Sequence, residues 1–283
     1  MARRTIDEIF GALEIDTSEE YQKLYEMVFE DDCSGGWNLS LAQYCDEHFT
    51  RQFSLRGTEV CLLGVWGKLD CGAGDNHEYD SADRLLLFCE LLVRFFSEAW
   101  PMIEQNNYNN TKPYCTTILG NIRYLLEKLG YEIRDIEAHP IICEKNQVAT
   151  IAAQVVENQE LIPDIYEYNH FSMKGDLDKK KRILLVLANE FEPHRTELEQ
   201  HGFQALASDL GYLLNSMHIR HNNKEGNKLN AQVVGMSSTE LEAWYDKTYQ
   251  ALLLALIAIE YIPTSQEVIQ LKKKSGRVEE TDG

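Results

Sequence analysis

The stretch Phe203-Gln204-Ala205-Leu206-Ala207-Ser208-Asp209-Leu210-Gly211-Tyr212-Leu213-Leu214-Asn215-Ser216-Met217 decides the fold class. Its large apolar residues recur every three or four positions: Phe203, Leu206, Leu210, Leu213, Leu214 and Met217. This spacing is typical of one face of an amphipathic α-helix that packs on a core. We therefore predict a helix from Phe203 to about Ile219, bounded by Gly202 and by a polar loop.

The same period continues on both sides of this helix and predicts a four-helix C-terminal bundle over residues 148–263. One segment runs from about Val148 towards Phe171 with a break at Pro163, and another runs from Leu177 to about Gln200. The last helix opens with Ser237-Ser238-Thr239-Glu240, which has capping-box form. We expect Pro263 to end it and residues 264–283 to form a flexible tail.

The N-terminal half, residues 1–130, also has helical periodicity and is expected to form a helical domain of its own. The pattern changes over residues 131–147, where Ile133, Ile136, Ile141 and Ile142 surround Pro140. These residues indicate a short β-hairpin or an extended connector. The predicted fold class is therefore mainly α, with two helical halves and a short connector between them.

Composition narrows the functional classes. The 283 residues carry 46 acidic and 27 basic side chains, a net charge of −19, which argues against general coating of DNA or anionic membrane.

The seven cysteines have no CxxC spacing, so we expect buried thiols in a reducing cytoplasm rather than a metal site. The longest apolar run, Ala251 to Ile259, is too short to span a bilayer. Phosphate-loop, dinucleotide and hydrolase motifs are absent from the sequence, and we expect no cofactor.

The most unusual local sequence lies at the end of the predicted third helix. Two histidines, one arginine, two asparagines and a lysine follow Met217 within seven residues: His218, Arg220, His221, Asn222, Asn223 and Lys224. One interpretation is that these groups only cap the helix, because cations at a helix C-terminus are favoured by the dipole. The other interpretation is a site in which Arg220 binds phosphate, His221 or His218 transfers protons, and Asn222, Asn223 and Lys224 hold the substrate.

A resemblance to a known family favours the second interpretation. The C-terminal half resembles bacterial abortive-infection and HEPN-type proteins in Asn215–Asn223 and in four other segments. These segments are Tyr166–His170, Lys174–Asp176, Leu187–Pro193 and Trp244–Tyr249. The resemblance covers residues 148–263 and implies a metal-independent endoribonuclease of phage defence or a toxin–antitoxin system. It also implies a homodimer that acts on RNA.

The motif of that family places a histidine four to six residues beyond the arginine and its polar neighbour, whereas no histidine follows His221. Two other pairs have the spacing, Arg134 with His139 and Arg195 with His201, but this is no more than chance provides.

The alternative is therefore a non-catalytic helical subunit that binds a protein partner or senses a phage component. A third hypothesis places the function in the N-terminal half. Geometry distinguishes the first two: catalysis needs Arg220 and a histidine to converge in a cleft, whereas the alternative needs them engaged in helix capping.

Overall fold

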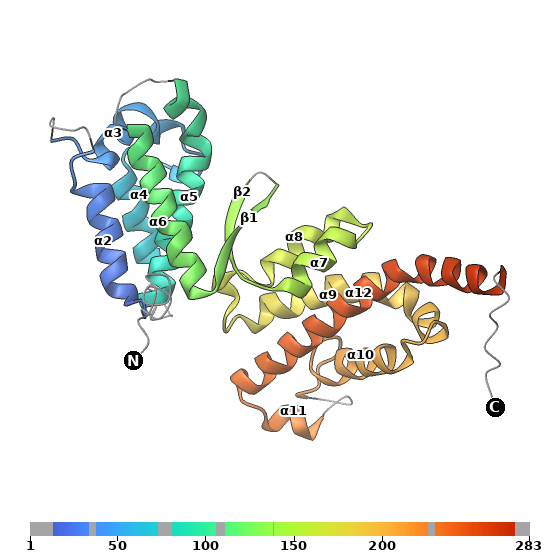
Figure 1. Ribbon diagram of the computed structural model, residues 1–283. Coiled ribbons are helices and arrows are strands. Elements are labelled where there is room, and N and C mark those ends of the chain that lie inside the picture. The colour runs from blue at the N-terminus through green and yellow to red at the C-terminus, as the bar shows by residue number, and fades with distance from the viewer. Residues whose placement is uncertain are drawn as a thin grey trace, which may run out of the picture. The chain divides into compact units, whose positions relative to one another are not determined.

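A computed structural model describes residues 14–33, 38–72, 81–105, 111–137, 139–225 and 230–274. The chain divides between Lys145 and Asn146 into two compact units, called unit 1 and unit 2 below. The described residues are mostly helical, and one two-stranded antiparallel sheet lies where the sequence predicts a hairpin (Figure 1). The mainly helical fold class is thus confirmed.

Unit 1 is built around one long helix. The helices of this unit are α2 (Thr17–Phe29), α3 (Leu41–His48), α4 (Leu62–Gly72), α5 (Ser81–Gln105) and α6 (Thr111–Leu129). Helix α5 packs against both α2 and α6, and almost every apolar residue on its inner face is buried. An aromatic cluster joins α2, α4 and α5: the Nε1–H of Trp66 donates to the hydroxyl of Tyr21 (3.1 Å), and the Tyr21 ring meets Phe88 edge-on.

The hairpin completes unit 1. Strand β1 (Tyr131–Ile136) follows Gly130, whose φ of 82° is the left-handed conformation that favours glycine after a helix. Strand β2 (His139–Glu144) pairs with it in antiparallel register. Helix α5 occupies the outer edge of β2, because Glu90 accepts from the Ile142 N–H (3.0 Å) and the Nε–H of Arg94 donates to the carbonyl of Pro140 (3.0 Å). The hairpin is therefore a fixed part of unit 1 rather than a free connector.

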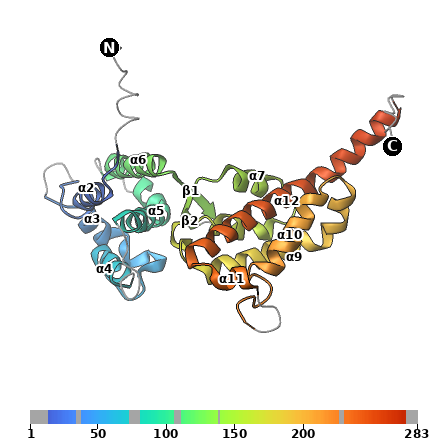
Figure 2. The same cartoon turned by 90° about the horizontal axis from the view of Figure 1, so that it is seen from below.

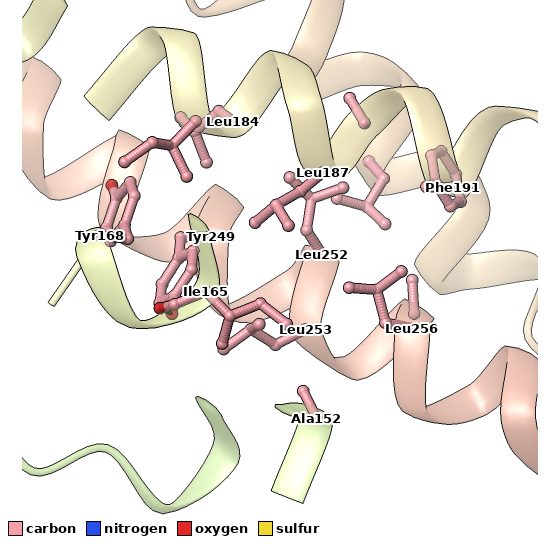
Figure 3. Close-up of a cluster of buried hydrophobic side chains, with 14 of the residues drawn as sticks. Ala152, Ile165, Tyr168, Leu184, Leu187, Phe191, Tyr249, Leu252, Leu253 and Leu256 are labelled. Atoms are coloured by element: carbon pink, nitrogen blue, oxygen red, sulfur yellow. Dashed lines mark hydrogen bonds between the residues drawn. The ribbon is translucent and has the colours of Figure 1, made fainter. Parts of the chain in front are cut away.

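Unit 2 is a bundle in which α12 contacts most other helices. Its elements are α7 (Gln147–Val155), α8 (Ile162–Glu167), α9 (Leu177–Gln200), α10 (Gln204–Ser216), α11 (Ala231–Gly235) and α12 (Ser238–Lys274). Helix α12 packs most extensively on α9, then on α7 and α10. Figure 3 shows the core between them, where Leu187 and Phe191 of α9 meet Leu252 and Leu256 of α12. A general helical bundle is thus present, whereas its assignment to the HEPN-like type rests on the resemblance alone.

Side-chain caps mark the starts of two helices in unit 2. Asp176 accepts from the backbone N–H of Lys179 (3.0 Å) at the start of α9. At the start of α12, the hydroxyl of Ser237 accepts from the Glu240 N–H, and the Glu240 carboxylate accepts from the Ser237 N–H. This exchange is the capping box that the sequence predicts.

The end of α12 differs from the prediction. Pro263 does not end the helix, which continues to Lys274, and the remaining residues 275–283 of the expected tail lie outside the described part of the chain. A proline inside a helix removes one backbone hydrogen bond, and α12 continues past Pro263 although residues 263–274 are mostly exposed. By length and composition alone α12 could cross a membrane, since one 18-residue window has a mean hydropathy of 1.4. A third of that window is buried inside the protein, and core helices of soluble proteins satisfy the same test.

Candidate functional site

The predicted site lies in the turn after α10, where two apolar side chains anchor the chain. Met217 and Ile219 are buried in the core of unit 2 and flank His218. His218 takes a φ of 60°, a left-handed conformation that is uncommon for a residue other than glycine. The turn ends the helix. Because Met217 and Ile219 point into the core, His218 and Arg220 lie on the outer side of this turn.

His218 and Asn223 hold one another across the turn. The backbone N–H of His218 donates to Oδ1 of Asn223 (2.9 Å), and the backbone N–H of Asn223 donates to Nδ1 of His218 (3.2 Å). Tyr245 of α12 donates to the carbonyl of His218 (3.4 Å), and Asn223 is buried. The two side chains therefore serve the backbone of the turn, which is the geometry that the capping interpretation requires.

Arg220 is paired with a carboxylate of the neighbouring helix. Its Nη1 lies 2.6 Å from Oε1 of Glu192 in α9, and both side chains are largely covered. Oε1 of Glu192 is buried and has no hydrogen bond of good geometry among the described residues. The contact is thus a close charge pair rather than an aligned hydrogen bond, and it neutralises the guanidinium that the prediction assigns to phosphate.

Positive charge gathers beside His218. Burial lowers the pKa of the His218 imidazole, and the neighbouring charges of Lys181 and Lys224 lower this pKa further, whereas a hydrogen bond with the backbone of His221 and the charge of Asp178 oppose them. Burial and Lys224 also lower the pKa of Lys181. His218 is therefore held neutral near pH 7, and the start of α9 and this turn form a local basic patch on an acidic protein.

The other predicted site residues do not converge on a common point. His221 is half-buried, and Asn222 is exposed with its Oδ1 accepting from the backbone N–H of Lys224 (3.2 Å). The two arginines of the chance motif pairs are held by their own glutamates, Arg195 by Glu199 (3.2 Å) and Arg134 by Glu132 (2.7 Å). The structure thus brings His218 and Asn223 together and places Arg220 against Glu192.

A groove in unit 1 is a second candidate site, and the sequence analysis does not predict it. It encloses about 590 Å³ between α5, α6 and the hairpin. Its wall is formed by Val93, Phe96, Ser97, Trp100, Thr116, Leu119, Arg123, Ile133, Asp135 and Pro140. This volume lies in the range of ligand-binding clefts, and the mixture of aromatic rings with a few polar groups is typical of such sites. The periodicity of α6 marks Arg123 only as an exposed residue, so no sequence signal leads to the groove.

Sequence reasoning also missed a polar network inside unit 2. Lys180 is buried, and its ammonium group contacts Glu242 (2.8 Å) and Asp246 (2.7 Å) of α12. The hydroxyl of Tyr168 donates to Asp246 (3.0 Å), and the Tyr168 ring stacks on Tyr249. Burial raises the pKa of Tyr168, and the charge of Asp246 raises it further. This network joins α8, α9 and α12 and leaves its members satisfied, so we assign it to the fold rather than to catalysis.

Neither a cluster of metal ligands among the described residues nor a relative identifies the site. Among the described residues, no three His, Cys, Asp or Glu side chains gather as metal ligands. No protein-family model, curated protein or solved structure matches this chain.

Proposed function

We propose that this protein is a non-catalytic binding or sensing subunit of a bacterial defence or toxin–antitoxin system. The observation that carries the proposal is the engagement of His218 with Asn223 and of Arg220 with Glu192. An acid–base catalyst needs groups that can reach a substrate, whereas these groups are occupied by contacts within unit 2. The link to defence comes from the resemblance in residues 148–263.

The groove of unit 1 is the binding site in this proposal. Phe96 and Trp100 offer aromatic surface, and Arg123 offers a charge to an acidic group of the partner. Among the described residues, neither Arg123 nor Asp135 has an ion-pair partner, so both remain available to a ligand. We propose a protein segment or phage component with an apolar side chain and a neighbouring carboxylate as the occupant.

The test compares growth under phage challenge for bacteria that express wild-type protein and variants, with total RNA run in parallel. We expect wild type and the double variant Arg220→Ala/His221→Ala to protect equally with intact RNA. We expect Leu119→Glu, which places a charge in the groove, to abolish protection. Thr117→Glu, an exposed change on the same helix outside the groove, is the matched control and should protect.

The ribonuclease is the second candidate, and the two lysines beside His218, Lys181 and Lys224, favour it. Such a patch could hold an RNA backbone in a strongly salt-dependent way. Cleavage of RNA by wild type, lost in Arg220→Ala/His221→Ala, would establish the ribonuclease and exclude the non-catalytic proposal. Protection that survives Leu119→Glu would remove the groove from the proposal.

A further inference from the structure

The solvent side of α12 carries an apolar stripe that its own unit does not cover. Leu254 and Tyr261 are each 50% exposed on the part of α12 whose opposite side is core, and Leu271, beyond the last buried residue Ile262, is 66% exposed. Val268 is also exposed, and Ile257 is partly covered. Leu254, Tyr261 and Val268 are seven residues apart, as are Ile257, Thr264 and Leu271. We call these six residues the seam.

This spacing is the heptad pattern of a coiled coil. The first set occupies the a positions and the second set the d positions, over the three heptads from Leu254 to Lys274. Pro263 falls at a c position, away from the seam, so its ring does not enter the contact surface. The last heptad has valine at a and leucine at d, the combination that favours two parallel strands.

The shape of unit 2 leaves the seam accessible along most of its length. Figure 2 shows the C-terminal part of α12 running on past α9 and α10. From Pro263 to Lys274 the helix is exposed at nearly every position, a length of about 18 Å. An isolated helical extension of this size is marginal in water, because its stability depends on packing an amphipathic face. The extension therefore calls for a partner helix along the seam.

Charges beside the seam favour pairing of α12 with α12 of a second copy in parallel orientation. Glu267 lies at a g position and Lys272 at the following e position. In a parallel pair the g residue of one helix meets the next e residue of the other, so Glu267 would face Lys272 of the second copy twice by symmetry. In an antiparallel pair g meets g, and the only charges there are Glu260, Glu267 and the terminal Lys274. The central contact would then join two glutamates and be repulsive.

We propose that the seam of α12 pairs in parallel and in register with the seam of a second copy of this chain, and that this contact makes the protein a homodimer. The pairing would bury the exposed apolar residues of both copies and add two ion pairs. Three heptads form a short coiled coil, so the association should depend on protein concentration.

Sedimentation equilibrium of the full chain over a range of concentrations tests the proposal. We expect wild type to be dimeric at high concentration and Val268→Asp/Leu271→Asp to be monomeric throughout. The control Gln266→Asp/Gln270→Asp, which adds the same charge to the same turns away from the seam, should remain dimeric. The substituted residues are exposed, and a thermal unfolding midpoint unchanged from wild type, followed by circular dichroism, would show that each variant is folded.

Orientation is tested separately by cysteine cross-linking. Leu271→Cys should form a disulfide-linked dimer under mild oxidation, because residue 271 faces its counterpart only in a parallel pair, whereas Gln270→Cys should not. A monomeric wild type, a dimer that survives Val268→Asp/Leu271→Asp, or a Leu271→Cys variant that fails to cross-link would each overturn the proposal. Seam-dependent binding of monomeric wild type to phosphatidylglycerol vesicles would overturn it in favour of a membrane surface.

Discussion

Lys180 places an ammonium group in the core of unit 2, between two carboxylates of α12. Breaking a buried pair by removing one partner destabilises a protein by about 3–5 kcal/mol, because the remaining charges are left uncompensated. The side chain of Asp246 is 49% exposed, so water can compensate part of this loss. Burial works against the charged form of Glu242, but hydrogen bonds from Lys180 and from the Gly175 N–H outweigh it and lower the pKa of this carboxyl.

We predict that Lys180→Ala lowers the free energy of unfolding by about 2–3 kcal/mol at pH 7. Lys179→Ala, which removes only the exposed pair with Asp176, should lower it by less than about 1 kcal/mol. Because the folded state depresses the pKa of Glu242, its stabilisation is present above the ordinary value of 4.5 and is lost as the pH falls below it. Urea unfolding at pH 7 and pH 4 should therefore show a smaller effect of Lys180→Ala at the lower pH. An equal effect at both would contradict this account.

The imidazole of His218 supplies a second prediction at this scale. NMR titration should find its pKa below the ordinary 6.5, with Lys181→Gln raising that pKa and Asp178→Asn lowering it further. Since the folded state disfavours the imidazolium, His218 contributes stability above pH 6.5 that is lost as the pH falls through the folded pKa. Shifts of the same sign in both variants would show that the charges do not act on the imidazole as described.

Single residues show where sequence reasoning succeeds. The capping roles of Ser237 and Glu240 depend on local spacing, and the sequence predicts them. Lys180 belongs to the basic run Lys179–Arg182, yet the apolar stripe of Ile183 and Leu187, extended back by one turn, falls on this position. The apolar stripe indicates burial at this position, but the two carboxylate partners lie more than 60 residues away, and spacing along the chain does not identify them.

At the scale of elements, one glycine lies inside α6 and another directly follows it, and the two make opposite demands on the backbone. Gly130 follows the helix with a φ of 82°, which an alanine adopts only with strain. Gly120 lies inside the helix, exposed, with no atom within 4 Å of the place that a Cβ would take. The same substitution at the two positions should therefore have effects of opposite sign.

We predict that Gly130→Ala destabilises unit 1 by about 1 kcal/mol and that Gly120→Ala stabilises it by about 0.5–1 kcal/mol. Urea unfolding followed by circular dichroism measures both. Destabilisation by both substitutions would mean that crowding around the added methyl group, not the backbone conformation, determines the change in stability.

The elements also show the limits of periodicity. Periodicity predicts α9 and α10 to within a few residues at both ends, because a single buried face marks each of them. It predicts that α12 ends at Pro263, whereas a proline inside a helix removes one backbone hydrogen bond and α12 continues to Lys274. The groove of unit 1 and the Glu192 partner of Arg220 arise from contacts between elements, which spacing within one element does not encode.

At the scale of the whole molecule, two units with separate internal packing should unfold separately. We predict two transitions in thermal or urea unfolding of the full chain. Lys180→Ala should lower only the unfolding midpoint of unit 2, which the fluorescence of Trp244 reports. Gly130→Ala should lower only the unfolding midpoint of unit 1, which the fluorescence of buried Trp66 reports. Movement of both midpoints by either variant would show that the units unfold as one.

The helix that closes the outer edge of β2 has a further consequence for how the sheet can grow. Glu90 and Arg94 occupy the outward N–H of Ile142 and the outward carbonyl of Pro140, so no strand can add there. Any added strand would have to pair with β1. A two-stranded sheet that can pair at one edge alone cannot extend beyond a single pairing. Strand exchange between molecules would therefore stop at two partners, and the continuous stacking that builds amyloid fibrils is blocked at this sheet.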